Sequence, residues 1–216
     1  PRYGKVALFK DDVVSKGMRT NFGWEHGLMN RVVEYITPNS TVLDVGANIG
    51  ASTLELYRST NAENVDYICV EMQADVLPLL KFNTRHIKGR QIYGGGLSDE
   101  PGVISYLDGI DEKFHNMGGI GPTKNIDGYP LHAASFVLDN IKLHKPISLL
   151  KCDTEGSEVF LFQGDRNRDW WREHGPEYVI IECFEQHQEK VFGFLEEYGY
   201  EKLWKQLNDH LWRRRR

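Results

Sequence analysis

The sequence predicts one doubly wound α/β domain, with a mostly parallel sheet, helices on both of its faces and an antiparallel hairpin near the C-terminus. Apolar runs typical of buried strands alternate along the chain with segments of helical periodicity. The first of these strands leads into a glycine-containing turn and then a helix. With 216 residues and 40% hydrophobic content, the chain is long enough for one sizeable core.

The first 40 residues are expected to form a helical region, and residues 41–216 the α/β core. Apolar residues recur at helical spacing over Trp24–Tyr35, and Pro38 with Asn39 ends that pattern. The core then begins with the strand Thr41–Val45, a helix that reaches Tyr57, the strand Tyr67–Val70 and the helix Ala74–His86. These segments make a βαβ unit, whose crossover should be right-handed.

The second half continues the alternation after a long interruption. Short strands are expected at Gln91–Tyr93 and Val103–Leu107, and residues 108–130 are glycine-rich, polar and without periodicity. We expect that segment to be a mobile loop or a lid over the substrate, with Phe114–Gly119 closing over it. The pattern resumes with a strand at Ile147–Cys152, a helix at Glu158–Gln163, a strand at Tyr178–Cys183, a helix at Gln188–Tyr198 and a hairpin of Leu203–Gln206 with His210–Arg213.

Composition excludes several classes of protein. A formal net charge of −5 and a pI near 5.9 disfavour binding to a nucleic-acid backbone, which depends on Lys and Arg. No apolar stretch approaches the roughly 20 residues of a membrane span. Cys69, Cys152 and Cys183 lie in apolar runs, as small core residues of a reducing compartment do, so a cytoplasmic location is expected. The start at Pro1 suggests a domain excised from a longer polypeptide.

The turn after the first strand predicts a ligand site. Gly46 and Gly50 allow a sharp turn and a close approach of a ligand, but Asn48 stands where a dinucleotide-binding G-x-G-x-x-G motif has its second glycine. A nicotinamide cofactor is therefore disfavoured. A plain tight turn would also explain the glycines; Asp44 at the strand end favours a ligand with an amino group.

Carboxylates also follow three later strands, at the edge where such sheets bind ligands. Glu71 lies roughly 20 residues beyond the glycine turn, where an acid can hold ribose hydroxyls; a helix-capping acid is the alternative. Lys151 and Asp153 end another strand, and charged groups there need pairing or a ligand, although a structural ion pair with helix capping would also suffice. Glu182 ends the next strand, and His187 follows it, where a surface histidine is the plainer interpretation.

Taken together, these residues resemble the FkbM-type methyltransferases over nearly the whole chain from Trp24 onward. The resemblance is carried by Val42–Gly50 with Thr53, by Glu71, by the Leu97–Ser98–Asp99 turn before Gly102, by Leu150–Glu158 and by Glu182. Lys151 to Glu158 is similar to the family's K-x-D-x-E-G-x-E pattern. The resemblance implies a class I methyltransferase (Rossmann-like) fold, S-adenosylmethionine as donor and O-methylation, frequently of sugars. The segment Gly109–Pro130 has no counterpart, and acceptor specificity is expected there.

On this reading the donor would bind along the first two strands. Gly46, Asn48 and Gly50 would lie under its methionine part, and Asp44 would receive its amino group. Glu71 would hold the ribose, with Ser98 or Asp99 near the adenine. For the chemical step we expect Asp153 as general base, Lys151 stabilising charge, and Glu155, Glu182 or His187 orienting the acceptor hydroxyl. A mechanism in which Asp153 and Glu182 share a divalent cation is an open alternative, and no metal is assigned.

The predicted substrate is a sugar hydroxyl in a glycan, such as that of a deoxysugar like rhamnose, and the expected partners are glycosyltransferase domains. An amine or nucleic-acid methyltransferase would instead be expected to carry an Asn/Asp-Pro-Pro-aromatic turn where this chain has Asp153–Gly156. A module that binds donor or glycan without catalysis, and an enzyme acting on a small non-sugar metabolite, remain alternatives.

Overall fold

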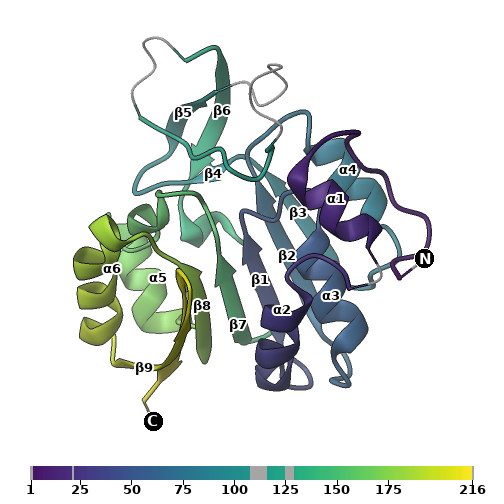
Figure 1. The fold of residues 1–216 in the computed structure, drawn as a ribbon. Helices are drawn as coiled ribbons and strands as arrows, with labels where there is room; N and C mark the ends of the chain where they lie inside the picture. Colours follow the sequence, from purple (N-terminus) through teal and green to yellow (C-terminus); the bar gives the residue numbers. More distant parts are fainter. Residues whose placement is uncertain (1, 21, 108–115, 125–128, 216) are drawn as a thin grey trace.

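The computed structural model describes residues 2–20, 22–107, 116–124 and 129–215. Its main sheet has seven strands in the order β3-β2-β1-β7-β8-β10-β9 (Figure 1). The strands are β1 (Thr41–Val45), β2 (Asp66–Glu71), β3 (Arg90–Gly94), β7 (Ile147–Cys152), β8 (Tyr178–Glu182), β9 (Tyr200–Gln206) and β10 (Asp209–Arg214). Neighbouring strands are parallel from β3 to β8, and β10 is antiparallel to both β8 and β9. The predicted parallel sheet with a C-terminal hairpin is thus confirmed.

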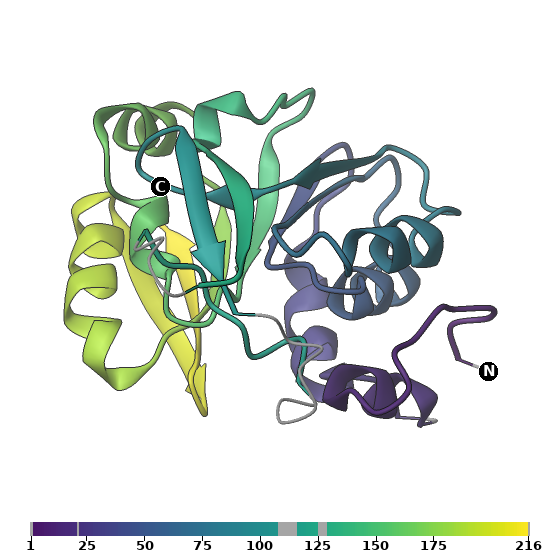
Figure 2. The same cartoon turned by 90° about the horizontal axis from the view of Figure 1, so that it is seen from above.

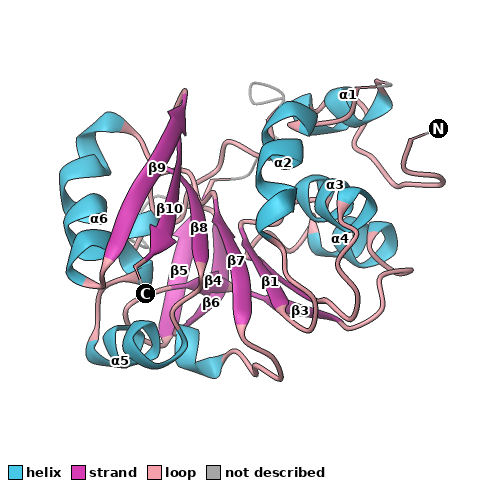
Figure 3. Cartoon of the chain, turned by 90° about the horizontal axis from the view of Figure 1, so that it is seen from below, coloured by secondary structure: helices cyan, strands magenta, loops and turns pink. Residues whose placement is uncertain are grey.

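Helices cover both faces of this sheet (Figure 3). One face carries α2 (His26–Val32), α3 (Ala51–Ser59) and α4 (Leu77–Asn83), with α1 (Val13–Arg19) beside them; the other carries α5 (Asp165–His174) and α6 (Glu185–Glu197). The described residues also form the short 3₁₀ helices η1 (Val33–Tyr35), η2 (Leu138–Asn140) and η3 (Glu158–Leu161). In the part of the chain that the structure describes, no helix has the length and apolar character needed to cross a bilayer.

The alternation of side chains along the central strands decides which charged groups meet. In β1, Val42 packs in the core beneath α2 and α3, whereas Leu43 packs in the core beneath α5 and α6. Asp44 therefore faces the α3 side, and it is opposite Lys151 of β7 in the strand register. Because Leu149 also faces that side, Lys151 does too. Two charges of opposite sign thus lie side by side under the same helices.

A second sheet stands above the carboxyl ends of the central strands (Figures 1 and 2). Its order is β4-β6-β5, formed by β4 (Gly96–Leu97), β5 (Gly102–Tyr106) and β6 (Leu131–Phe136). The strand β5 was predicted, but its partner β6 was not, because Ala133, Ala134 and Ser135 carry little of the β-branched or aromatic signal of a strand.

Three helical predictions needed correction, and the first is the helix expected over Ala74–His86, which is the shorter α4. The helix expected over Glu158–Gln163 is only the 3₁₀ turn η3, and the α-helix of this crossover is α5. Its first turn is charged and polar, and its apolar side depends mainly on Trp170 and Trp171, so the periodicity was too weak to detect. The expected helix over Trp24–Tyr35 is shorter as well, because the chain enters it through Glu25 in a left-handed conformation.

Candidate active site

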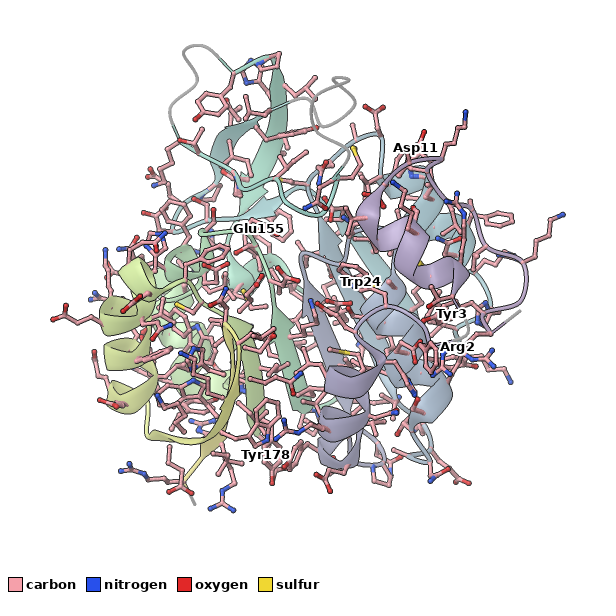
Figure 4. The ribbon with its side chains drawn as sticks, in the orientation of Figure 1. Arg2, Tyr3, Asp11, Trp24, Glu155 and Tyr178 are labelled. Atoms are coloured by element: carbon pink, nitrogen blue, oxygen red, sulfur yellow. The ribbon has the colours of Figure 1, made fainter. Side chains whose placement is uncertain are left out.

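A cavity opens at the carboxyl ends of β1, β2, β7 and β8, where a doubly wound sheet binds its ligands. Its wall combines the glycine turn after β1, the acidic ends of β2, β7 and β8, and segments from outside the main sheet. Trp24, before α2, and Glu155, after β7, approach it from two sides (Figure 4). Of the predicted site residues, the lining includes Gly46, Asn48, Glu71, Lys151, Asp153, Glu155 and Glu182.

The glycine turn is shaped by close contact between two loops. Gly46 has φ +80°, and a Cβ there would lie 1.8 Å from the carbonyl oxygen of Asp153. Only glycine fits this close approach. The approach is maintained because the Asp153 N–H donates to the Val45 carbonyl at 3.0 Å. Asn48 is left-handed too, at φ +48°, and Asn tolerates that region better than most residues. The glycine turn and the loop after β7 are therefore held in close contact.

Glu71 is held at the cavity by backbone donors. Its two carboxylate oxygens accept the N–H groups of Asn48 and Gln73, both at 2.8 Å. Burial raises the pKa of Glu71 to about 7, even though these hydrogen bonds favour the charged form. The remaining lone pairs of its oxygens are available to hydroxyl groups of a ligand in the cavity.

The other predicted donor residues lie outside the lining. Asp44 is 1% exposed and accepts a hydrogen bond from the Thr53 hydroxyl. Gly50 begins α3 at φ +86°. The carbonyl of Ser98 accepts from Asn167 at 2.8 Å, and Asp99 forms an ion pair with Lys124 at 2.5 Å. The residues just before these two, 95–97, line the cavity instead.

Lys151 is the positive centre of the site. It is 4% exposed, and its Nζ lies 3.0 Å from Asp153 Oδ2. Burial alone would lower the pKa of Lys151, but the carboxylates of Asp153, Glu25 and Asp44 hold that pKa well above its ordinary value. The charged form of the ammonium is thus favoured, and the same attraction holds the pKa of Asp153 below its usual range despite burial.

Two further carboxyl groups adjoin Asp153. Glu182 shares a hydrogen bond with Asp153, and burial together with that negative neighbour raises the pKa of Glu182. Burial and the charge of Asp153 likewise raise the pKa of Glu155 to about 7. One oxygen from each of these three carboxyl groups lies within 4.8 Å of the others. Such an oxygen set suits a hard divalent cation, so the residues present fit the metal alternative as well.

The loop that carries these groups is held from below by Glu158, which is 1% exposed. Its Oε1 accepts the N–H groups of Thr154 and Gly156, each at 3.1 Å, and the Thr154 hydroxyl at 3.0 Å. This explains the acid at the end of the K-x-D-x-E-G-x-E pattern as a support for the loop. His187 lies behind the loop: a Cβ on Gly156 would be 3.7 Å from its Nε2, and it is not part of the lining.

Part of the predicted lid reaches the cavity. Phe114 and His115 lie outside the described residues, but Asn116, Gly118, Ile120 and Pro122 are in the lining. Met117 is anchored on both sides, because its N–H donates to Asp12 at 3.0 Å and its carbonyl accepts from Gln73 at 2.7 Å. Whether this segment opens and closes stays a prediction.

Among the lining residues that were not singled out from the sequence are Trp24, Glu25 and Ser52. Trp24 and Glu25 come before the first strand, where no strand end or glycine turn marked them. Ser52 follows the glycine turn by two residues, and that position in the first turn of a helix was the one available signal.

Comparison with known proteins agrees with this geometry. The family model described as "Methyltransferase FkbM domain" matches residues 44–202. The methyltransferase FkbM structure from Methylobacillus flagellatus KT matches with a TM-score of 0.58 and 15% identity, over 82% of this chain and 44% of that one, so the chain spans less than half of that protein. The precorrin-6y C5,15-methyltransferase of Geobacter metallireducens GS-15 matches with a TM-score of 0.50 and 10% identity, over 96% of this chain and 91% of that one. No curated protein matches the sequence significantly.

Proposed function

The chain belongs to the FkbM methyltransferase family and takes its methyl group from S-adenosylmethionine. We propose that it transfers this methyl group to a hydroxyl oxygen of a sugar. The observation that carries the proposal is the pairing of two half-sites in one cavity. Glu71 and the glycine turn form a donor half, and Asp153, Glu155 and Glu182 around Lys151 form an acceptor half.

The acceptor half favours oxygen as the methylated atom. Its side chains offer several hydrogen-bond acceptors for hydroxyl groups, and Trp24 with Ile120 adds apolar surface to the same cavity. The turn after β7 reads Asp153-Thr154-Glu155-Gly156, without the proline-aromatic turn expected of an amine methyltransferase. Among the described residues of the lining, the carboxyl groups outnumber the one cation, Lys151, and this disfavours an anionic acceptor.

In the chemical step, the acceptor oxygen attacks the methyl carbon in line with the carbon–sulfur bond. As the new bond forms, that bond breaks and its electron pair moves to sulfur, leaving the neutral thioether. The attacking oxygen becomes an oxonium and is strongly acidic, so even Asp153, whose pKa is lowered, suffices to accept its proton. Lys151 holds Asp153 in position, while Glu155 and Glu182 accept or donate hydrogen bonds to neighbouring hydroxyls.

The test is turnover across a panel of neutral, amino and acidic glycosides, with S-adenosylhomocysteine and product mass measured together. A product heavier by one methyl group, located on oxygen by NMR, is expected for a neutral sugar. Binding of S-adenosylhomocysteine without turnover of any glycoside would favour the alternative of a non-catalytic donor-binding module. Methylation confined to non-sugar alcohols would move the acceptor to another class.

A further inference from the structure

We propose that Glu25 binds the α-ammonium group of S-adenosylmethionine, the role that the sequence pattern suggested for Asp44. The inference rests on the proposed function, in which Glu71 holds the donor's ribose. It assigns a positioning role to a residue that precedes the first strand and belongs to no recognised motif.

The order of groups in the donor places the ammonium near Glu25. The ribose joins the adenine on one side to the sulfonium and amino acid on the other. With the ribose at Glu71, the adenine extends toward Met72 and residues 95–97, on the β2–β3 side of the cavity. The amino acid then extends the opposite way, over the glycine turn toward the first turn of α3. Glu25 and Ser52 line that end, where the Ser52 hydroxyl donates to Glu25 Oε2 at 3.1 Å.

Asp44 is poorly placed for the same contact. It lies beneath the turn at 1% exposure, outside the lining, with Thr53 donating to one of its oxygens. The positive charge of Lys151 already acts on it, since Lys151 lies opposite it in the strand register. A ligand in the cavity reaches Glu25 directly but would reach Asp44 only after the turn had moved.

The conformation of Glu25 supports a binding role. It is left-handed at φ +49°, a region that glutamate disfavours and that is retained mostly where a site requires it. Glu155, across the cavity, is left-handed as well, at φ +54°. The segment before α2 is fixed from behind, since the Trp24 N–H donates to the Tyr3 hydroxyl at 3.2 Å and both Tyr3 and Arg2 bond to Glu55 of α3 (Figure 4). Glu25 is therefore held in position before a ligand binds.

Charge balance also calls for a cation at this end. Lys151 is already paired with Asp153 at 3.0 Å, and burial raises the pKa of Glu25 even with Lys151 nearby. A ligand ammonium beside Glu25 would supply the missing positive charge in a partly buried setting, where charge-assisted hydrogen bonds are strongest.

The experiment compares two ligands by calorimetry at pH 8: S-adenosylhomocysteine and its analogue with hydrogen in place of the α-amino group. We expect the unmodified protein to prefer the first by roughly 10- to 100-fold. Glu25→Gln and Glu25→Asn should lose that preference while binding the analogue as well as the unmodified protein does. Glu34→Gln, an exposed acid just beyond α2, is the matched control and should keep the preference.

Folding does not confound this comparison. Asparagine is better tolerated than glutamate at positive φ, so Glu25→Asn should unfold at the same temperature as the unmodified protein or higher. The assignment is overturned if both Glu25 variants keep the preference, if Asp44→Asn alone removes it, or if the Glu25 variants raise only the acceptor KM. Failure of the unmodified protein to bind S-adenosylhomocysteine at all would instead overturn the donor site as a whole.

Discussion

At the scale of single residues, the site depends on how burial and neighbours change each carboxyl group. Asp153 and Glu182 come from adjacent parallel strands and share a hydrogen bond, yet their pKa values move in opposite directions. The difference comes from Lys151, which lies 3.0 Å from Asp153 and stabilises its charge. Two similar side chains thus take different roles at neutral pH, one as an anion and one as a proton holder.

Glu71→Ala should weaken donor binding. The substitution removes an acceptor for both ribose hydroxyls and leaves the N–H groups of Asn48 and Gln73 without their partner. A loss of roughly 1.5 to 3 kcal/mol in binding free energy is expected, measured by calorimetry with S-adenosylhomocysteine. Glu63→Ala, an exposed acid before β2, serves as control. Equal affinities for the Glu71 variant and the unmodified protein would remove Glu71 from the donor site.

Asp153→Asn should separate donor binding from catalysis. It keeps the size of the side chain but removes the proton acceptor, so turnover should fall by about 10²- to 10⁴-fold while donor affinity is retained. If turnover stays near normal, Asp153 is neither the base nor a ligand of an essential metal. A loss seen only in Glu182 or His187 variants would assign the base to one of those residues.

The same carboxyl groups permit a test for a metal. Asp153, Glu155 and Glu182 offer oxygen atoms within 4.8 Å of one another, and a bound divalent cation would lower the pKa of the acceptor hydroxyl. The mechanism in which Asp153 acts as the base predicts full activity after exhaustive chelation with EDTA. Activity that disappears on chelation and returns with added magnesium would establish the metal-dependent alternative.

At the scale of elements, the segment from Asn116 to Pro122 connects the small sheet to the acceptor half of the cavity. A Cβ on Gly121 would lie 2.3 Å from the Glu155 carbonyl, and the Pro122 carbonyl accepts from Ser157 at 3.2 Å. Met117 ties the same segment to Asp12 before α1. Elements distant in sequence therefore enclose this half of the cavity together.

Ile120→Ala should weaken acceptor binding and spare the donor. Truncating this apolar lining residue removes contact surface beside Glu155, so the acceptor KM should rise about tenfold with little change in the affinity for S-adenosylhomocysteine. Val103→Ala, 57% exposed on β5 and outside the lining, is the matched control. A donor affinity that falls as much as the acceptor affinity would show that the segment supports the whole cavity.

At the scale of the whole molecule, the acidic cavity makes stability depend on pH. Burial is the main cause that raises the pKa of Glu71, Glu155 and Asp209 to about 7 in the folded protein, and it raises that of Glu182 too. In the unfolded chain these groups titrate near pH 4. Between pH 6.5 and 8 the folded state therefore binds more protons than the unfolded state, and stability falls as pH rises.

We accordingly expect the melting temperature to be a few degrees lower at pH 8 than at pH 6.5. Thermal unfolding of a double variant, Glu155→Gln with Glu182→Gln, should show a weaker dependence because two of the titrating groups are gone. The buried His210, whose pKa is lowered to about 4 in the folded protein, opposes this trend in the lower part of the interval, because the unfolded chain still binds part of a proton there. A melting temperature that rises from pH 6.5 to pH 8 would contradict the raised pKa values of these carboxyl groups.

The sequence by itself determined the sheet, the glycine turn and the strand ends that carry Glu71, Asp153 and Glu182, because these depend on local periodicity and on the geometry of parallel strands. It did not reveal β6, whose alanines and serine carry little strand signal, or α5, whose apolar side rests on two tryptophans. Only the tertiary structure showed that Asp44 lies beneath the turn, that Glu158 supports a loop, and that Glu25 reaches the cavity. The physical reason is that local pattern specifies where a strand ends, whereas the packing of distant segments decides which carboxylates are buried, paired or open to a ligand.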